Sequence, residues 1–167
     1  MHKWPFFVYP TNIQNDLKKL KNIIINLPKP IVFTNGVFDI LHIGHIKYLQ
    51  ESKKLGSSLV VGVNSDESTK LLNKGAKRPI NPYEERAEVI ASLKMVDLSI
   101  IFREQTPLSL IDFVMPQIYT KGNDYNLQTI EYSDHLKSKG IKIKFIPLIK
   151  DKSSTNVLKK LIYNSKF

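Results

Sequence analysis

Hydrophobic and polar positions along this chain alternate between two patterns. Short continuous apolar runs, typical of strands buried on both faces of a parallel sheet, occur at 31–33 and 58–63. Longer segments with apolar residues every three or four positions, typical of amphipathic helices, occupy 12–26 and 43–55. The alternation continues, and it predicts strands at 98–102, 117–121 and 141–146 and helices at 81–95, 106–114, 126–139 and 153–162. These elements predict an α/β fold, a Rossmann-like parallel five-stranded sheet with helices on both faces, plus an N-terminal helix.

The length of 167 residues suits one domain with a single core. Within it we expect an irregular arm over 1–11, an N-terminal helix over 12–27 and a Rossmann-like core over 30–163. No run of about 18 apolar residues occurs, so the sequence predicts no membrane span. The first ten residues hold two prolines and no small-residue cleavage site, which argues against a signal peptide and for a cytoplasmic location.

The chain has 25 Lys and Arg residues and 15 Asp and Glu residues, which gives a formal net charge of +10. This positive charge favours anionic partners. The lysines are spread along the chain, and no basic block carries interleaved aromatic residues. A lysine-rich surface around a nucleotide pocket explains the charge, and we expect neither a nucleic acid nor a membrane as partner. The chain has no cysteine, which excludes disulfides.

Two histidines mark the junction between the strand at 31–33 and the helix after it. His42 and His45 are three positions apart, so they lie on one side of the first helical turn, with Gly44 between them. A helix N-terminus attracts phosphate, and a glycine there lets a phosphate approach the backbone. A metal site is the alternative, but there is no cysteine and no third ligand nearby. The pair therefore favours phosphate chemistry.

A basic loop over 71–81 follows the second buried strand and could clamp a triphosphate through Lys74 and Arg78. Arg86, in the next helix, could reach the same anion. The alternative is an ordinary solvated surface. Asn81, followed by Pro82, is expected to cap that helix.

Three further groups of polar residues follow predicted strands or open a predicted helix. Each has a ligand-binding interpretation and a local structural one. Asn64, Ser65 and Asp66 could contact substrate or cap a helix, and Lys121, Gly122 and Asp124 could contact the base or ribose or form a tight turn. Ser153, Ser154 and Thr155 could bind phosphate or cap a helix.

The run from Thr34 to His45, Thr-Asn-Gly-Val-Phe-Asp-Ile-Leu-His-Ile-Gly-His, resembles the signature of the HxGH nucleotidyltransferases, the cytidylyltransferase-like group. The resemblance extends over about 12–163 and is strongest to the heptose-1-phosphate adenylyltransferase branch. Val37 and Asn123 stand where that branch typically has cysteine and glycine. The chain lacks the arginine that glycerol-3-phosphate cytidylyltransferases carry before the Ser-Thr motif, which favours the adenylyltransferase branch.

The resemblance implies transfer of AMP from ATP to a heptose 1-phosphate, giving ADP-heptose and pyrophosphate for a surface glycan. It also implies a homodimer and Mg²⁺ bound through the ATP phosphates, with no metal ligand from protein side chains. The roles it implies are catalysis by His42, His45 and Lys74; nucleotide binding by Phe33, Thr34, Gly36, Asp39, His42, Gly44, His45, Arg78, Gly122, Asp124, Ser153, Ser154 and Thr155; and acceptor binding by Asn64, Asp66, Lys74 and Lys121. The alternatives are a cytidylyltransferase acting on glycerol 3-phosphate or a similar alcohol phosphate, and a non-catalytic nucleotide- or RNA-binding module.

Overall fold

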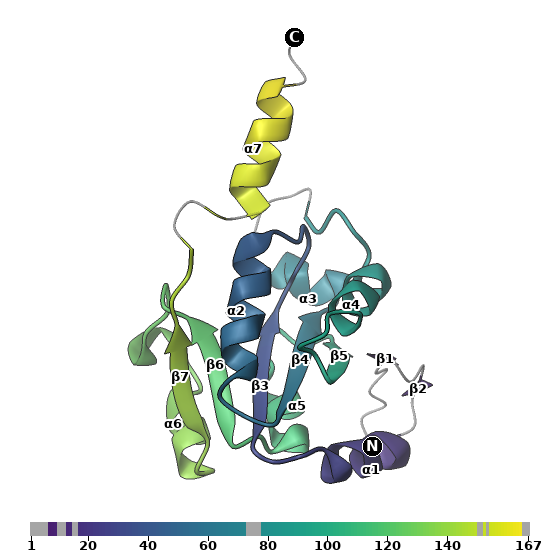
Figure 1. The fold of residues 1–167 in the computed structure, drawn as a ribbon, viewed down its shortest axis with the longest axis vertical. Coiled ribbons are helices and arrows are strands. Elements are labelled where there is room, and N and C mark those ends of the chain that lie inside the picture. Colours follow the sequence, from purple (N-terminus) through teal and green to yellow (C-terminus); the bar gives the residue numbers. More distant parts are fainter. Residues whose placement is uncertain are drawn as a thin grey trace.

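A seven-stranded sheet forms the centre of the molecule (Figure 1). The computed structural model describes residues 7–9, 13–14, 17–72, 78–149, 152 and 154–164. The strands are β1 Phe7–Tyr9, β2 Ile13–Gln14, β3 Ile31–Gly36, β4 Ser58–Asn64, β5 Leu98–Phe102, β6 Ile118–Gly122 and β7 Lys142–Ile146, and their order across the sheet is β2-β1-β5-β4-β3-β6-β7. Five neighbouring strands, β5, β4, β3, β6 and β7, are parallel to one another, which confirms the predicted parallel sheet.

Helices cover both faces of this sheet. They are α1 Leu17–Asn26, α2 Ile43–Lys53, α3 Asp66–Leu71, α4 Tyr83–Ala91, α5 Leu108–Val114, α6 Ser133–Ser138 and α7 Ser154–Asn164, with a short 3₁₀ turn, η1, at Leu127–Thr129. One apolar cluster joins α1, α5 and α6 to the sheet, and a second joins α2 and α4 to the other face. The first turn of α7 lies near the start of α2, and the rest of α7 extends away from the sheet (Figure 1).

Strand β3 lies at the point where the order of connections reverses. The chain passes from β3 to β4 on one side and later returns to pair β6 along the other side of β3. In open α/β sheets, ligands bind outside the carboxyl ends of the strands at such a switch point. Helix α2, with the histidine pair at its start, follows directly from β3, so the fold places this pair at the expected binding crevice.

The N-terminal region differs from the prediction. The arm expected to be irregular over 1–11 contains β1, and the helix expected from residue 12 begins at Leu17, after β2. Strand β1 pairs antiparallel with the edge strand β5, Val8 opposite Ile100. An unpaired strand edge offers hydrogen bonds to any extended segment, and this tertiary pairing is invisible to local periodicity.

Two predicted helices are shorter or divided. The helix expected over 126–139 is η1 followed by α6, because Asn126 and Thr129 form a capping box that closes a separate short turn. The helix expected from Asn81 begins at Tyr83, and its N-cap is Pro82. The Asn81 side chain instead donates a 2.6 Å hydrogen bond to the carbonyl of Asp39.

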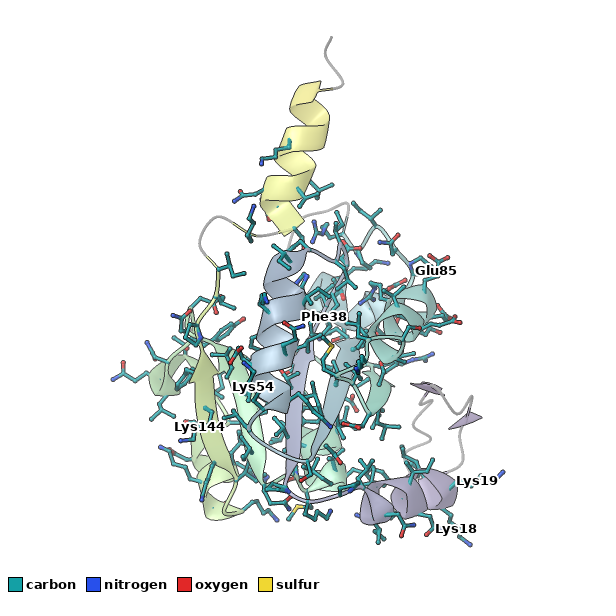
Figure 2. All side chains as sticks on the ribbon, in the orientation of Figure 1. Lys18, Lys19, Phe38, Lys54, Glu85 and Lys144 are labelled. Atoms are coloured by element: carbon teal, nitrogen blue, oxygen red, sulfur yellow. The ribbon has the colours of Figure 1, made fainter. Side chains whose placement is uncertain are left out.

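Some of the lysines lie far apart on the surface. Lys18 and Lys19 lie on α1 and Lys144 lies on β7, on opposite sides of the molecule (Figure 2). This distribution agrees with a solvated lysine-rich surface. Among the helices in the described part of the chain, none has the length and apolar character needed to cross a membrane.

Candidate active site

The start of α2 carries the predicted histidine pair. The His42 and His45 rings stack with their centroids 3.9 Å apart and an interplanar angle of 26°. His42 is the N-cap of α2, and its Nδ1 atom accepts a 3.1 Å hydrogen bond from the N–H of Gly44. In the neutral ring the proton is therefore on Nε2, which is the atom able to donate to a phosphate oxygen.

Gly44 is needed for a reason different from the predicted one. A Cβ atom at this position would lie 2.8 Å from the Cε1 and Nδ1 atoms of His42 and 3.3 Å from the Lys152 carbonyl oxygen. The glycine thus makes room for the capping imidazole and for the loop before α7. Its N–H is bonded to His42, so the imidazole occupies the backbone donor that we expected to face a phosphate directly.

The surroundings of the His42 ring favour its neutral form. Burial of the ring lowers its pKa below the ordinary value of 6.5, and the nearby Lys152 ammonium lowers it further. Protonation would also remove the acceptor that caps Gly44. Because the folded-state pKa is lowered, the stability that this neutral cap contributes is complete above pH 6.5 and is lost as the pH falls through the folded value.

An NMR titration of the imidazole resonances tests this protonation state. We expect the His42 midpoint to lie below 6.5, and Lys152→Gln to move it upward because a repelling cation is removed. The same titration on the exposed-lysine variant Lys137→Gln serves as the matched control and leaves the midpoint where it was. A His42 midpoint at or above 6.5 would contradict this account.

Phe38 also contacts His45. Its ring meets the His45 ring edge-on at a centroid distance of 5.4 Å, and its backbone adopts a φ of 51°. A bulky residue in the left-handed region is strained, and such strain persists only where its surroundings enforce it. Gly36 is part of those surroundings, because a Cβ there would lie 3.0 Å from the Phe38 ring. Nothing in the sequence pattern signals this strained residue, which Figure 2 labels.

Asp39 and Arg78, both predicted to bind nucleotide, contact each other. The buried Asp39 carboxylate lies 2.7 Å from Nε of Arg78 and accepts hydrogen bonds from the N–H groups of Ile80 and Asn81. Asp39 therefore fastens the 78–81 loop to the segment before α2. The Asp39 carboxylate is engaged in these internal contacts, and its ion pair with Nε holds the Arg78 guanidinium in place.

Arg86 is buried and does not reach toward an anion. The exposed fraction of its side chain is 1%. It donates to the carbonyl oxygens of Val37, Asn64 and Asn81 and pairs with Asp66 at 2.7 Å. The expectation that Arg86 joins a triphosphate clamp does not fit this geometry, because its guanidinium is buried and engaged by these four partners. Arg86 instead links the segment after β3, the junction of β4 with α3 and the segment before α4.

The polar residues after β4 serve the local structure. Asn64 is buried and donates to Ser68 at 2.8 Å, and Ser65 is the N-cap of α3, so the capping interpretation is confirmed for Ser65. Asp66, predicted with Asn64 to bind the acceptor, is half-buried and paired with Arg86. Both side chains make internal hydrogen bonds, and their contact with the acceptor stays a prediction.

The chain makes the predicted tight turn at the end of β6. The N–H of Tyr125 donates a 3.0 Å hydrogen bond to the carbonyl of Gly122, which closes this turn. A Cβ at Gly122 would lie 2.5 Å from Oδ1 of Asp124, so the glycine makes room for that carboxylate. Lys121 extends over the rings of Tyr119 and Tyr125, with Nζ 5.8 and 5.2 Å from their centroids. These residues form a cationic and aromatic wall beside β3.

Helix α7 begins over the start of α2. The Ser154 hydroxyl donates a 3.1 Å hydrogen bond to the carbonyl of Ile40, and Thr155 is exposed beside it. Two predicted site residues, Lys74 and Ser153, lie outside the described residues. Phe33 and Thr34 are fully buried: Phe33 packs in the core, and the Thr34 hydroxyl bonds to Tyr48 at 2.6 Å and to the carbonyl of Thr120.

The fold and the histidine pair together define a nucleotidyltransferase-type site, and comparison with known families agrees. The chain belongs to the cytidylyltransferase-like family, whose profile matches residues 33–160. This confirms the resemblance in the Thr34–His45 segment.

Named relatives narrow the comparison. The chain is 45% identical over 135 residues to the D-beta-D-heptose 1-phosphate adenylyltransferase of Bordetella bronchiseptica, covering 81% of this chain and 83% of that protein. It is 50% identical over 133 residues to the bifunctional protein HldE of a Nitratiruptor species, covering 80% of this chain and 28% of the relative. The chain spans about three tenths of the length of such bifunctional relatives.

Solved structures show the same architecture. The lipopolysaccharide core biosynthesis protein of Thermoplasma volcanium superposes with a TM-score of 0.62 at 38% identity, over 73% of this chain and 98% of that one. The pantothenate synthetase of Thermus thermophilus superposes with a TM-score of 0.59 at 16% identity, which shows a shared fold alone.

Proposed function

We propose that this protein transfers AMP from ATP to a heptose 1-phosphate, giving ADP-heptose and pyrophosphate. The observation that carries the proposal is the stacked pair His42 and His45 at the start of α2, beside the switch point of the sheet. The relative named D-beta-D-heptose 1-phosphate adenylyltransferase supports the choice of substrates, because the alignment covers most of both chains.

The reaction requires positioning and charge neutralisation more than proton transfer. An oxygen of the acceptor phosphate forms a bond to the α-phosphorus of ATP, and the bond from that phosphorus to the bridging oxygen of the β-phosphate breaks. Pyrophosphate leaves with the electron pair. The attacking oxygen is already ionised, so no general base is needed.

The imidazoles supply hydrogen-bond donors to the α-phosphate as its charge changes. Nε2 of His42 is free of the capping bond that Nδ1 makes, and the His45 ring packs against the rings of both His42 and Phe38. Rings held in this way need little reorganisation during the reaction, which is the main source of electrostatic stabilisation in such sites. The N-terminus of α2 adds its positive dipole end beneath them.

The remaining phosphates and the acceptor would lie on either side of this pair. Lys74, Arg78, Ser153, Ser154 and Thr155 are proposed to hold the β- and γ-phosphates, and Gly122 and Asp124 to contact the adenosine. Lys121 is proposed to attract the acceptor phosphate, supported by its place on the other side of β3. Asn64 and Asp66, also predicted to bind the acceptor, make internal hydrogen bonds, so any contact they make with it would be in addition to these bonds.

Mg²⁺ is proposed to enter with the triphosphate and to be held by its oxygens. Within the described ranges, no three His, Asp or Glu side chains gather in a way that could hold a metal ion. The nearest carboxylate on the loop before α2, Asp39, is engaged with Arg78 and two backbone N–H groups. Mg²⁺ bound with the nucleotide would supply positive charge that offsets the negative charge of the departing pyrophosphate. A homodimer, implied by the resemblance, is a further proposal that sedimentation at several concentrations would test.

Nucleotide preference tests the proposal against its nearest alternative. Pyrophosphate release is measured with Mg²⁺ for ATP, CTP, GTP and UTP, each paired with heptose 1-phosphate and with glycerol 3-phosphate. We expect release with ATP and heptose 1-phosphate only. Release with CTP and glycerol 3-phosphate would instead show a cytidylyltransferase, and no release with any pair would contradict both.

A further inference from the structure

The carboxyl end of β3 presents a polar side chain on the sheet face opposite α2. Along β3, Thr34 faces Tyr48 of α2, whereas Phe33 and Asn35 face the side covered by α5 and α6. Asn35 therefore lies across the switch point from the histidine pair, and the backbone carbonyl of Asn35 is 3.5 Å from Nζ of Lys121. Asn35 and the Lys121 ammonium thus lie together at the carboxyl end of β3.

A tyrosine relay fixes the orientation of the Asn35 amide. The hydroxyl of Tyr119 donates a 2.8 Å hydrogen bond to Oδ1 of Asn35 and lies 2.7 Å from the hydroxyl of Tyr132. Because the single hydroxyl hydrogen of Tyr119 goes to Asn35, Tyr132 must donate to Tyr119. With Oδ1 engaged, the two N–H bonds of Nδ2 are the groups that Asn35 can offer, and no acceptor for them is found among the residues that the structure describes.

The relay remains protonated over the physiological range. Burial raises the pKa of Tyr132 to about 12 and raises that of Tyr119 well above its ordinary value. Neither phenol becomes a phenolate near neutral pH, so the donor from Tyr119 to Asn35 persists. The amide is therefore held in one orientation whatever the protonation state of the histidines.

The chemistry of this corner suits an oxygen-rich anion. Two oriented N–H donors and one ammonium, bordered by the rings of Tyr119 and Tyr125, match the phosphate and hydroxyl oxygens of a phosphorylated sugar. The α-phosphate of the nucleotide is assigned to the α2 side of the crevice, so the molecule on the Asn35 side is the attacking one. A carboxylate in place of the amide would repel that anion.

We propose that Asn35 is a specificity-determining residue of this site, donating hydrogen bonds from Nδ2 to an oxygen of the acceptor sugar phosphate. Tyr119 and Tyr132 are its positioning residues. The inference rests on the proposed function, since it names which substrate of that reaction the residue contacts.

The test varies each substrate of the Asn35→Asp variant in turn while the other is saturating, and follows pyrophosphate release. A hydrogen bond to a charged group accounts for about 10–10²-fold in affinity, so the KM for heptose 1-phosphate is expected to rise by about that factor. The KM for ATP should stay within about twofold. Asn22→Asp, the same change on the exposed face of α1, is the matched control and should alter neither constant.

Two further variants keep the result independent of folding. Asn35→Ala removes the donor without adding charge and should raise the same KM less than Asn35→Asp does. Tyr119→Phe releases the amide from its fixed orientation and should raise the acceptor KM severalfold with the ATP KM unchanged, a split that general destabilisation would not produce. Thermal unfolding of each variant confirms that the folded enzyme is compared.

The outcomes separate this inference from the proposed function. If the natural protein releases no pyrophosphate from ATP and heptose 1-phosphate, the proposed function fails and the inference fails with it. If the natural protein is active but the Asn35 variants change the KM for ATP, or change neither KM, only the inference is overturned.

Discussion

His45→Ala is expected to lower kcat by about 10²–10³-fold, the usual effect of removing one preorganised donor to a developing negative charge. The His45 ring packs against His42 and Phe38, and the N-cap of α2 is His42, so the loss of His45 removes a donor without removing a helix cap. His42→Ala would combine both effects because His42 is the N-cap. Steady-state turnover with saturating ATP and heptose 1-phosphate is the measurement.

The control for this prediction is His135→Ala. His135 belongs to α6 and pairs with Asp112 at the surface, and a surface pair of this kind contributes about 0–1 kcal/mol to stability. Its turnover should be close to that of the natural protein. Near-normal turnover of His45→Ala, with folding confirmed by circular dichroism, would show that the histidine pair is not the catalytic centre.

Arg86→Met is expected to lower the free energy of unfolding by about 3–5 kcal/mol, the usual cost of leaving a buried charge network without one partner. The change removes the donors to the carbonyls of Val37, Asn64 and Asn81 and leaves those oxygens buried without their hydrogen bonds. Urea denaturation followed by far-ultraviolet circular dichroism measures this effect.

Two variants calibrate the Arg86 result. Asp66→Asn should cost clearly less, because Asp66 is partly exposed and the three carbonyl contacts of Arg86 remain. Arg103→Met, the same substitution at an exposed arginine after β5, should change the free energy of unfolding by less than about 1 kcal/mol. An Arg86→Met protein as stable as the Arg103→Met protein would refute the structural role assigned here.

Sequence reasoning reaches the histidine pair because the pattern that produces it is local. Three-residue spacing at a strand-to-helix junction is enough to place His42 and His45 on one side of α2, and the rings indeed stack. The five parallel strands follow from continuous apolar runs for the same reason, since burial on both faces leaves a mark on each segment separately.

Contacts between distant segments leave no such mark. The charge of Arg86 suggests an anion, but its four partners come from three segments that only the folded chain brings together. Asn35 and Tyr119 are 84 residues apart, and the hydrogen bond between them depends on the pairing of β3 with β6. Strand β1 likewise forms only because the edge of β5 is available to it. The same residue types bind ligands and hold loops together. Only the contacts in the folded chain show which of the two roles a given side chain has.

The measurement that tests the central claim most directly is ³¹P NMR of the complete reaction with ATP, Mg²⁺ and heptose 1-phosphate. Attack at the α-phosphorus predicts equal amounts of pyrophosphate and of a sugar nucleotide with two coupled diphosphate resonances. The appearance of ADP together with a doubly phosphorylated sugar would place the attack at the γ-phosphorus, and would contradict the account.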